Sequence, residues 1–141
     1  MALQAFIAVS VTAIAVVIAA VIKRRTRVDA PTQPASYAVP AMLDRADFER
    51  PEAPWLVAVF SSSTCLSCQD ALDKARHLES AEVVVQEVEA VERKDLHQRY
   101  SIDAVPMIVI VDDVGETRAS FIGVPSAADL WSAMAELRAP G

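Results

Sequence analysis

The chain contains two cysteines, Cys65 and Cys68, and only two residues separate them. They follow an apolar run and a short polar loop, and from Cys65 onward apolar residues recur at three- and four-residue steps, which is helical spacing. The first turn of a helix favours an anion, because its amides are unpaired and the helix dipole points its positive end there. The position therefore predicts a lowered thiol pKa at Cys65, and Cys68, one turn later, can attack a mixed disulfide formed at Cys65.

Two other interpretations of the cysteines stay open at this point. The pair is compatible with inert packing of two small apolar side chains. A metal site would need more ligands, and neither His77 nor His97 has a metal-type spacing to the pair. Both histidines are predicted to be solvated surface residues, and an iron–sulfur cluster with four thiolates would require two chains. We therefore expect no metal, and no cofactor other than a Cys65–Cys68 disulfide.

The segments around the pair alternate between strand-like and helix-like patterns. Four strands are predicted, at residues 55–60, 83–88, 107–111 and 117–122, and the first and third are apolar throughout, as in strands buried on both faces. Helices are predicted from Cys65, over 93–100 and after the capping residue Ser126, and a hairpin turn is predicted at 112–115. A short edge strand over 37–42 and a short helix over 44–50 precede them. The alternation predicts an α/β sheet with helices on both faces.

The N-terminal segment has the character of a membrane span. Residues 3–22 carry no charge and, at 1.5 Å per residue, would form about 30 Å of helix, the thickness of a bilayer core. A cleaved secretory signal would carry its positive charge before the apolar segment, whereas here the basic cluster of residues 23–27 follows it. Because basic clusters stay on the cytoplasmic side, we expect the N-terminus outside and the rest of the chain inside. The predicted parts are an anchor (1–22), a basic collar with a proline-containing linker (23–36) and a domain (37–141).

The charge of the chain limits the choice of partners. The whole chain has 13 basic and 19 acidic residues, a net charge of −6, and the acidic excess lies in residues 30–141. An acidic domain binds nucleic acid poorly and is repelled by anionic lipid headgroups, which would instead attract the basic collar. We therefore expect no nucleic-acid partner, and contact with the membrane through residues 3–22.

Several features taken together resemble the thioredoxin family. They are the apolar strand at 55–60, the Cys65-Leu66-Ser67-Cys68 motif, the segment 99–116 with Val105-Pro106 before a strand, and the ending 120–130. The resemblance covers roughly residues 42–137. It implies a three-layer α/β/α sandwich with a mixed central sheet. It also implies thiol–disulfide oxidoreductase activity on protein disulfides, with an electron donor such as thioredoxin reductase or another thiol system.

The resemblance also implies a role for individual residues. Cys65 would be the attacking cysteine, Cys68 the resolving one, and Pro106 a cis-proline that faces the disulfide. Val105, Ile122 and Gly123 would join Pro106 along the groove that holds an extended substrate chain. Thr64, Leu66 and Ser67 would complete the active-site loop.

Four residues depart from the family pattern. Thr64 stands where thioredoxins have tryptophan, and Leu66-Ser67 where they have Gly-Pro. Val59 stands where they bury an acid that helps to move the proton of the resolving cysteine. Cys68 would then be deprotonated by water, the substrate or another group, and we expect slow turnover as a consequence.

The similarity to membrane-tethered bacterial proteins with a thioredoxin-like domain suggests a location in the bacterial inner membrane, with the domain in the cytoplasm. The expected function is reduction of protein disulfides near the membrane. Two alternatives use the same fold: a thiolate site for Cu(I), and a docking module whose cysteines have no redox role.

Overall fold

The computed structural model of the protein describes residue 14 and residues 37–139. A compact unit of the chain begins at Tyr37. Its elements, in chain order, are η1 (Arg45–Asp47), β1 (Trp55–Ser61), α2 (Leu66–Arg76), β2 (Val83–Glu89), α3 (Lys94–Arg99), β3 (Met107–Val111), β4 (Thr117–Ile122) and α4 (Ala127–Arg138). The four strands and three helices predicted from residue 55 onward are confirmed, and their ends differ by a few residues at most.

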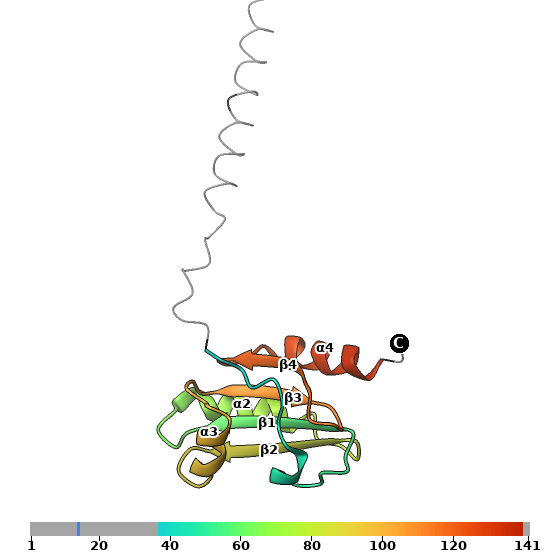
Figure 1. Ribbon diagram of the computed structural model, residues 1–141. Helices are drawn as coiled ribbons and strands as arrows, with labels where there is room; N and C mark the ends of the chain where they lie inside the picture. Colours follow the sequence, from blue (N-terminus) through green and yellow to red (C-terminus); the bar gives the residue numbers. More distant parts are fainter. Residues whose placement is uncertain (1–13, 15–36, 140–141) are drawn as a thin grey trace, which may run out of the picture. The chain divides into compact units, whose positions relative to one another are not determined.

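The strands form one mixed sheet in the order β2-β1-β3-β4 (Figure 1). Strands β1 and β2 are parallel, and α2 forms the crossover that a parallel pair requires. Strand β3 runs antiparallel to β1, and β4 runs antiparallel to β3. The two strands predicted to be buried on both faces lie in the middle of the sheet, and every residue of β3 is buried. The mixed sheet expected from the thioredoxin resemblance is confirmed.

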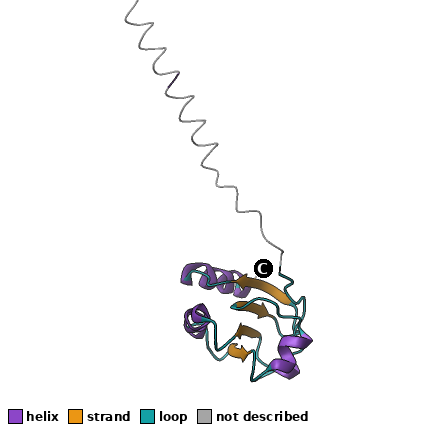
Figure 2. Ribbon diagram, turned by 90° about the vertical axis from the view of Figure 1, so that its left-hand side faces the viewer, coloured by secondary structure: helices purple, strands orange, loops and turns teal. Residues whose placement is uncertain are grey.

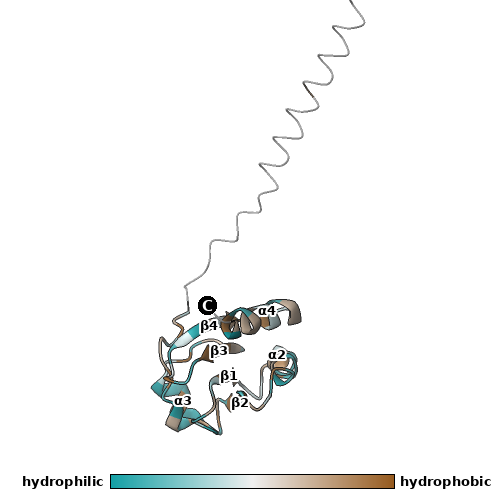
Figure 3. Ribbon diagram, turned by 90° about the vertical axis from the view of Figure 1, so that its right-hand side faces the viewer, coloured by the Kyte–Doolittle hydropathy of each residue, from teal (hydrophilic) through white to brown (hydrophobic). Residues whose placement is uncertain are grey.

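Helices cover both faces of the sheet, which gives three layers (Figure 2). On one face Leu96 of α3 packs on side chains of β1 such as Phe60. On the other face Leu72 of α2 and Leu130 of α4 pack on Val59 of β1 and its neighbours. Figure 3 shows the sheet nearly end-on between α3 on one side and α2 with α4 on the other. The predicted α/β/α sandwich is confirmed for the described residues.

The segment before β1 differs from its prediction. Residues 37–42 do not form a strand. They pair with the sheet only through a single β-bridge between Met42 and Glu116, the residue just before β4. Pro40 has no amide hydrogen to donate, which prevents a regular ladder there. The predicted helix over 44–50 is the three-residue 3-10 helix η1, capped by the side chain of Asp44.

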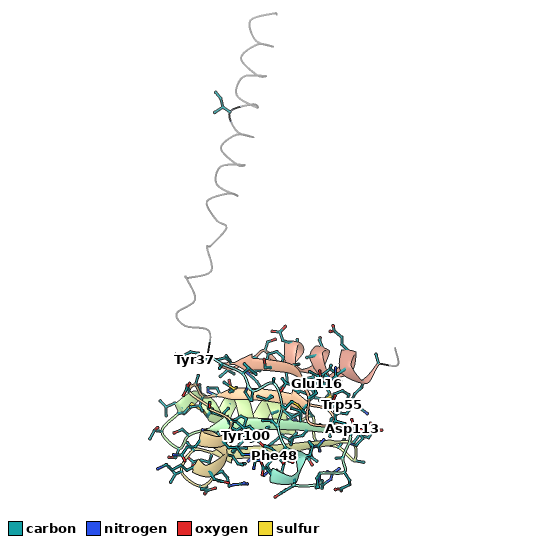
Figure 4. All side chains as sticks on the ribbon, in the orientation of Figure 1. Tyr37, Phe48, Trp55, Tyr100, Asp113 and Glu116 are labelled. Atoms are coloured by element: carbon teal, nitrogen blue, oxygen red, sulfur yellow. A yellow bond between two sulfur atoms is a disulfide. The ribbon has the colours of Figure 1, made fainter. Side chains whose placement is uncertain are left out.

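The segment around η1 is instead held in place by contacts with Tyr100. The hydroxyl of Tyr100, just after α3, accepts a hydrogen bond from the amide of Asp44 at 2.9 Å and donates one to Asp47. Its ring stacks on Phe48 with centroids 6.3 Å apart (Figure 4). Burial and the carboxylate of Asp47 raise the pKa of Tyr100 to about 12, so this phenol remains a donor at physiological pH.

The prediction for one histidine is wrong. His97 was expected to be solvated, but its Nε2 lies 2.7 Å from the carbonyl oxygen of Val88, and its ring meets Phe60 edge-on at 5.4 Å between centroids. His97 therefore joins α3 to β2.

The apolar stripe predicted for the last helix is wrong at one position. Trp131 of α4 is half exposed, whereas Leu130 beside it is fully buried.

Within the part of the chain that the structure describes, no helix has both the length and the apolar character needed to cross a membrane. The predicted span over residues 3–22, apart from Ile14, and the predicted collar and linker over 23–36 lie outside the described residues.

Candidate active site

The register of the sheet brings the predicted site residues to one end of it. Phe60, near the end of β1, pairs with Met107 at the start of β3, and Met107 pairs with Ile122 at the end of β4. Pro106 directly precedes β3, and its carbonyl oxygen accepts a hydrogen bond from the amide of Gly123 at 2.9 Å. The cysteine loop that follows β1 therefore leaves the sheet at the same end as the Val105-Pro106 and Ile122-Gly123 segments.

The peptide bond between Val105 and Pro106 is cis, as the resemblance implied. Pro106 is buried, and Val105 is half-buried against the core on the α3 side of the sheet. Ile122, by contrast, is an exposed apolar side chain (46% exposed), and Gly123 after it has a φ of +88°. Of the four residues predicted to border a substrate groove, Pro106 is therefore buried, whereas Ile122 presents an accessible apolar side chain.

Cys65 is the N-cap residue of α2 and is linked to Cys68 by a disulfide, with Cα atoms 5.4 Å apart. The two cysteines differ in access: Cys65 is half-buried, whereas Cys68 is only 3% exposed. A dissolved disulfide can therefore reach Cys65 but not Cys68. This difference agrees with the predicted division into an attacking and a resolving cysteine.

The side chains between the cysteines have separate environments. The Oγ of Ser67 lies 3.6 Å from the Sγ of Cys65. Because a disulfide sulfur carries no hydrogen, the hydroxyl of Ser67 is the donor in this contact, and the same donor can stabilise a thiolate at Cys65 after reduction. Leu66, the residue after Cys65, is 98% exposed, so its isobutyl side chain lies in solvent.

The loop before Cys65 is fixed by local hydrogen bonds. The carbonyl oxygen of Ser62 accepts from the amide of Cys65 at 3.0 Å, and the hydroxyls of Ser62 and Thr64 lie 3.1 Å apart. The amide of Ser63 donates to Oε1 of Glu89 at 2.9 Å. The loop is thereby tied to β2, one of the two edge strands of the sheet.

Glu89 holds this region together. Besides the amide of Ser63, its carboxylate accepts the amides of Val91 at 2.7 Å and Glu92 at 2.9 Å. These backbone donors, that of Glu92 first, lower the pKa of Glu89 below its ordinary value. Glu89 therefore remains ionised at neutral pH and orders both the cysteine loop and the turn that follows β2.

Position 59, where thioredoxins bury an acid, is a valine in this chain, but another acidic residue lies beside it in the sheet. Val59 is fully buried in β1, and its partner across the parallel pair is Glu87 of β2. A cavity of about 260 Å³ beside the disulfide is lined by Ser62, Ser63, Cys65, Leu66, Cys68, Gln69, Glu87 and Glu89. Neither glutamate is predicted as a site residue from the sequence, because the alternation in residues 83–89 indicates that both lie on one face of a strand, but not which face.

Within residues 37–139, no three histidine, cysteine, aspartate or glutamate side chains are grouped so that they could hold a metal ion. His77 lies at the C-terminal end of α2, the opposite end of that helix from the cysteines, and His97 is engaged with Val88.

The chain is similar to solved thioredoxin structures. No protein-family model and no curated protein matches it. A mutant thioredoxin from Halobacterium salinarum NRC-1 superposes with a TM-score of 0.57 at 21% sequence identity, over 64% of this chain and 80% of that one. The germline-specific thioredoxin Deadhead from Drosophila melanogaster gives 0.56 at 23% identity, over 65% and 89%. The thioredoxin of Fasciola hepatica gives 0.51 at 22% identity, over 60% and 83%.

At these identities the similarity establishes the fold, so the class of protein is a thioredoxin-like α/β protein. This one carries a Cys-x-x-Cys disulfide at the N-terminus of α2 and a cis-proline before β3. The predicted resemblance to thioredoxins is confirmed at that level.

Proposed function

We propose that the protein is a membrane-anchored thiol–disulfide oxidoreductase that reduces protein disulfides close to the membrane. One observation carries the proposal: a partly exposed Cys65 at a helix N-terminus is disulfide-bonded to Cys68, of which only 3% is exposed. An accessible sulfur in an anion-favouring position, with a shielded partner within bonding distance, has the arrangement that two-step disulfide exchange requires.

The reaction starts from the dithiol form. The thiolate of Cys65 attacks one sulfur of a substrate disulfide, which forms a mixed disulfide and releases the other substrate sulfur as a thiolate. Cys68 then attacks the Sγ of Cys65, which forms the Cys65–Cys68 disulfide and releases the second substrate sulfur. Two electrons pass from the protein to the substrate, so an external dithiol donor, such as a thioredoxin reductase or another thiol system, must restore the protein.

The proposed substrate surface lies beside Cys65. An extended segment of the substrate would pair with the backbone of Val105 next to Pro106, and with the Ile122-Gly123 segment opposite. Apolar side chains of the substrate would contact Leu66 and Ile122, both of which are exposed. Because thioredoxins bear a glycine in place of Leu66, this surface should prefer substrates with an apolar residue next to the cysteine.

The proposed setting is the bacterial inner membrane. Support comes from the uncharged segment at residues 3–22 and the basic cluster that follows it, which favours a cytoplasmic domain. Residues 23–36, with two prolines, would serve as a linker of about 3.1 Å per residue where extended, so substrates at or near the bilayer are the ones within reach.

The test is substrate trapping in cells. The variant Cys68→Ser retains the attacking thiol but cannot resolve the mixed disulfide, and should accumulate disulfide-linked partners that are enriched in membrane proteins. The matched control, Cys65→Ser, retains the buried thiol and should trap none. If Cys68→Ser captures no more than the control, disulfide exchange is not the function, and tight stoichiometric binding of Cu(I) by the reduced protein should then be measured.

The direction of electron flow has a separate test. The reduction potential of the Cys65–Cys68 pair, equilibrated against glutathione buffers, should lie near that of thioredoxin, about −270 mV, if the protein is a reductant. A potential close to about −120 mV, as in a strong periplasmic oxidant, would contradict both the proposed direction and the proposed side of the membrane.

A further inference from the structure

The resolving cysteine has an unusual access to water. Cys68 is 3% exposed, yet it lines the cavity of about 260 Å³ beside the disulfide, together with Glu87 and Glu89. Since a water molecule occupies roughly 30 Å³ in the liquid, the cavity has room for several of them between polar walls. A proton can therefore leave Cys68 through this cavity, although the core side of the sulfur is closed.

The position of Glu87 on the sheet places it on the Cys68 side. Val59, its partner in β1, packs in the core cluster that includes Ala71 and Leu72 of α2, so cross-strand neighbours at this position share the α2 face. The hydroxyl of Ser61 donates to Oε1 of Glu87 at 2.7 Å, which orients the carboxylate. Its Oε2 has no hydrogen-bond partner among the described residues.

Glu89, the other acid of the cavity, cannot perform the same task. Its two carboxylate oxygens accept three backbone amides, from Ser63, Val91 and Glu92. Taking up a proton would break at least one of these bonds and release the cysteine loop. Of the two acids that line the cavity, Glu87 alone can exchange a proton without dismantling the site.

We propose that Glu87 is the proton acceptor for Cys68 during resolution, acting through cavity water, and that it replaces the acid missing at position 59. The proposal rests on the thiol–disulfide exchange proposed above. As the Sγ of Cys68 bonds to the Sγ of Cys65, the Cys68 proton passes through water to Glu87. The bond between Cys65 and the substrate sulfur breaks, and the leaving thiolate takes its proton from Glu87 or from solvent. When the disulfide is reduced again, the transfer runs in reverse.

The charges around the cavity make such a base necessary. The titratable groups that line it are Cys65, Cys68, Glu87 and Glu89, from the N-terminal turn of α2 and from β2, and β1 contributes no charged side chain. No basic side chain lines the cavity in the described part of the chain. Two carboxylates disfavour a free thiolate at Cys68. The thiol should therefore stay protonated until the attack, when Glu87 removes its proton.

The first test resolves the two chemical steps. The reduced full-length protein is mixed with an aromatic disulfide whose thiolate absorbs visible light, so attack by Cys65 and resolution by Cys68 each release one chromophore. In Glu87→Gln the second release should slow by roughly 10²-fold at neutral pH, the usual contribution of a general base, while the first is unchanged. Its rate should also rise steadily with pH, because hydroxide must then remove the proton. Glu136→Gln, the same charge change on the exposed face of α4, should match the wild type.

The second test does not depend on exchange. In Cys65→Ser, the thiolate absorbance of Cys68 should appear only at raised pH, because the carboxylate of Glu87 shares the cavity and disfavours a second negative charge. In Cys65→Ser with Glu87→Gln it should appear at lower pH. An unchanged titration together with an unchanged second release would overturn the role of Glu87. If the wild-type protein shows no exchange at all, the proposed function fails, and the titration alone then decides whether Glu87 and Cys68 are coupled.

Discussion

Restoring an acid at Val59 should make the stability of the protein strongly dependent on pH. Val59 is fully buried between Glu87 on β2 and Ile108 on β3, so the carboxyl group of Val59→Asp would be desolvated and would also face a second acid. Full burial raises a carboxyl pKa by about 3–5 units, from about 3.9 to about 7–9. The new carboxyl group would therefore be neutral in the folded protein at pH 7 and ionised in the unfolded chain.

The sign and size of the effect follow from linkage. Because the folded-state pKa is raised, stability falls as the pH rises above about 3.9, and it continues to fall until the folded-state pKa is reached. Each pH unit in that window costs about 1.36 kcal/mol, so the variant should lose about 2.7 kcal/mol between pH 5 and pH 7. Urea unfolding followed by tryptophan fluorescence measures this loss, and Val59→Asn, which does not titrate, is the control at each pH. A difference between Asp and Asn that stays constant from pH 5 to pH 7 would show that position 59 is hydrated, contrary to the packing described above.

Three further predictions concern the frame of the site. Gly115→Ala should lower the melting temperature more than Gly123→Ala. Both glycines have φ near +90°, but a Cβ at Gly115 would lie 2.0 Å from the carbonyl oxygen of Leu43, whereas a Cβ at Gly123 would meet nothing within 4 Å. Equal decreases in melting temperature for the two variants would contradict this. Glu89→Gln should speed amide hydrogen exchange at Ser63, whose amide donates to the Glu89 carboxylate. Because the pKa of Glu89 is lowered in the folded protein, its carboxylate stabilises the fold above the unfolded-state pKa, and this stability is lost as the pH falls below about 4.5. The variant should lack this loss, so a stability that falls below pH 4.5 as steeply as in the wild type would refute the prediction. Ser126→Ala should destabilise the fold by about 1 kcal/mol, because the hydroxyl caps α4 by accepting the amide of Asp129 at 3.1 Å, and thermal unfolding measures the loss.

The strands and helices that position the cysteines could be predicted from the sequence because each has a local pattern. Strands β1 and β3 are unbroken apolar runs, and α2 begins where helical spacing begins. The segment at 37–42 could not, because a proline and a single bridge decide its conformation rather than its apolar residues. His97 was misjudged for a similar reason: its partner, the carbonyl oxygen of Val88, comes from tertiary packing.

The acid beside Cys68 is the clearest case of information that a local pattern does not hold. The sequence shows a valine at position 59 but does not predict which residue lies beside it in the sheet. The parallel register of β1 and β2 places Glu87, 28 residues later in the chain, directly beside Val59. Moving the carboxylate from the central strand to the edge strand changes its chemistry, because an edge position is open to water and needs no buried charge. Cys65, at the helix N-terminus with the Ser67 hydroxyl beside it, is in a setting that favours a thiolate, whereas Cys68 faces two carboxylates that favour the thiol. In the proposed exchange reaction, these opposite environments, rather than the cysteine spacing alone, would account for Cys65 attacking and Cys68 resolving.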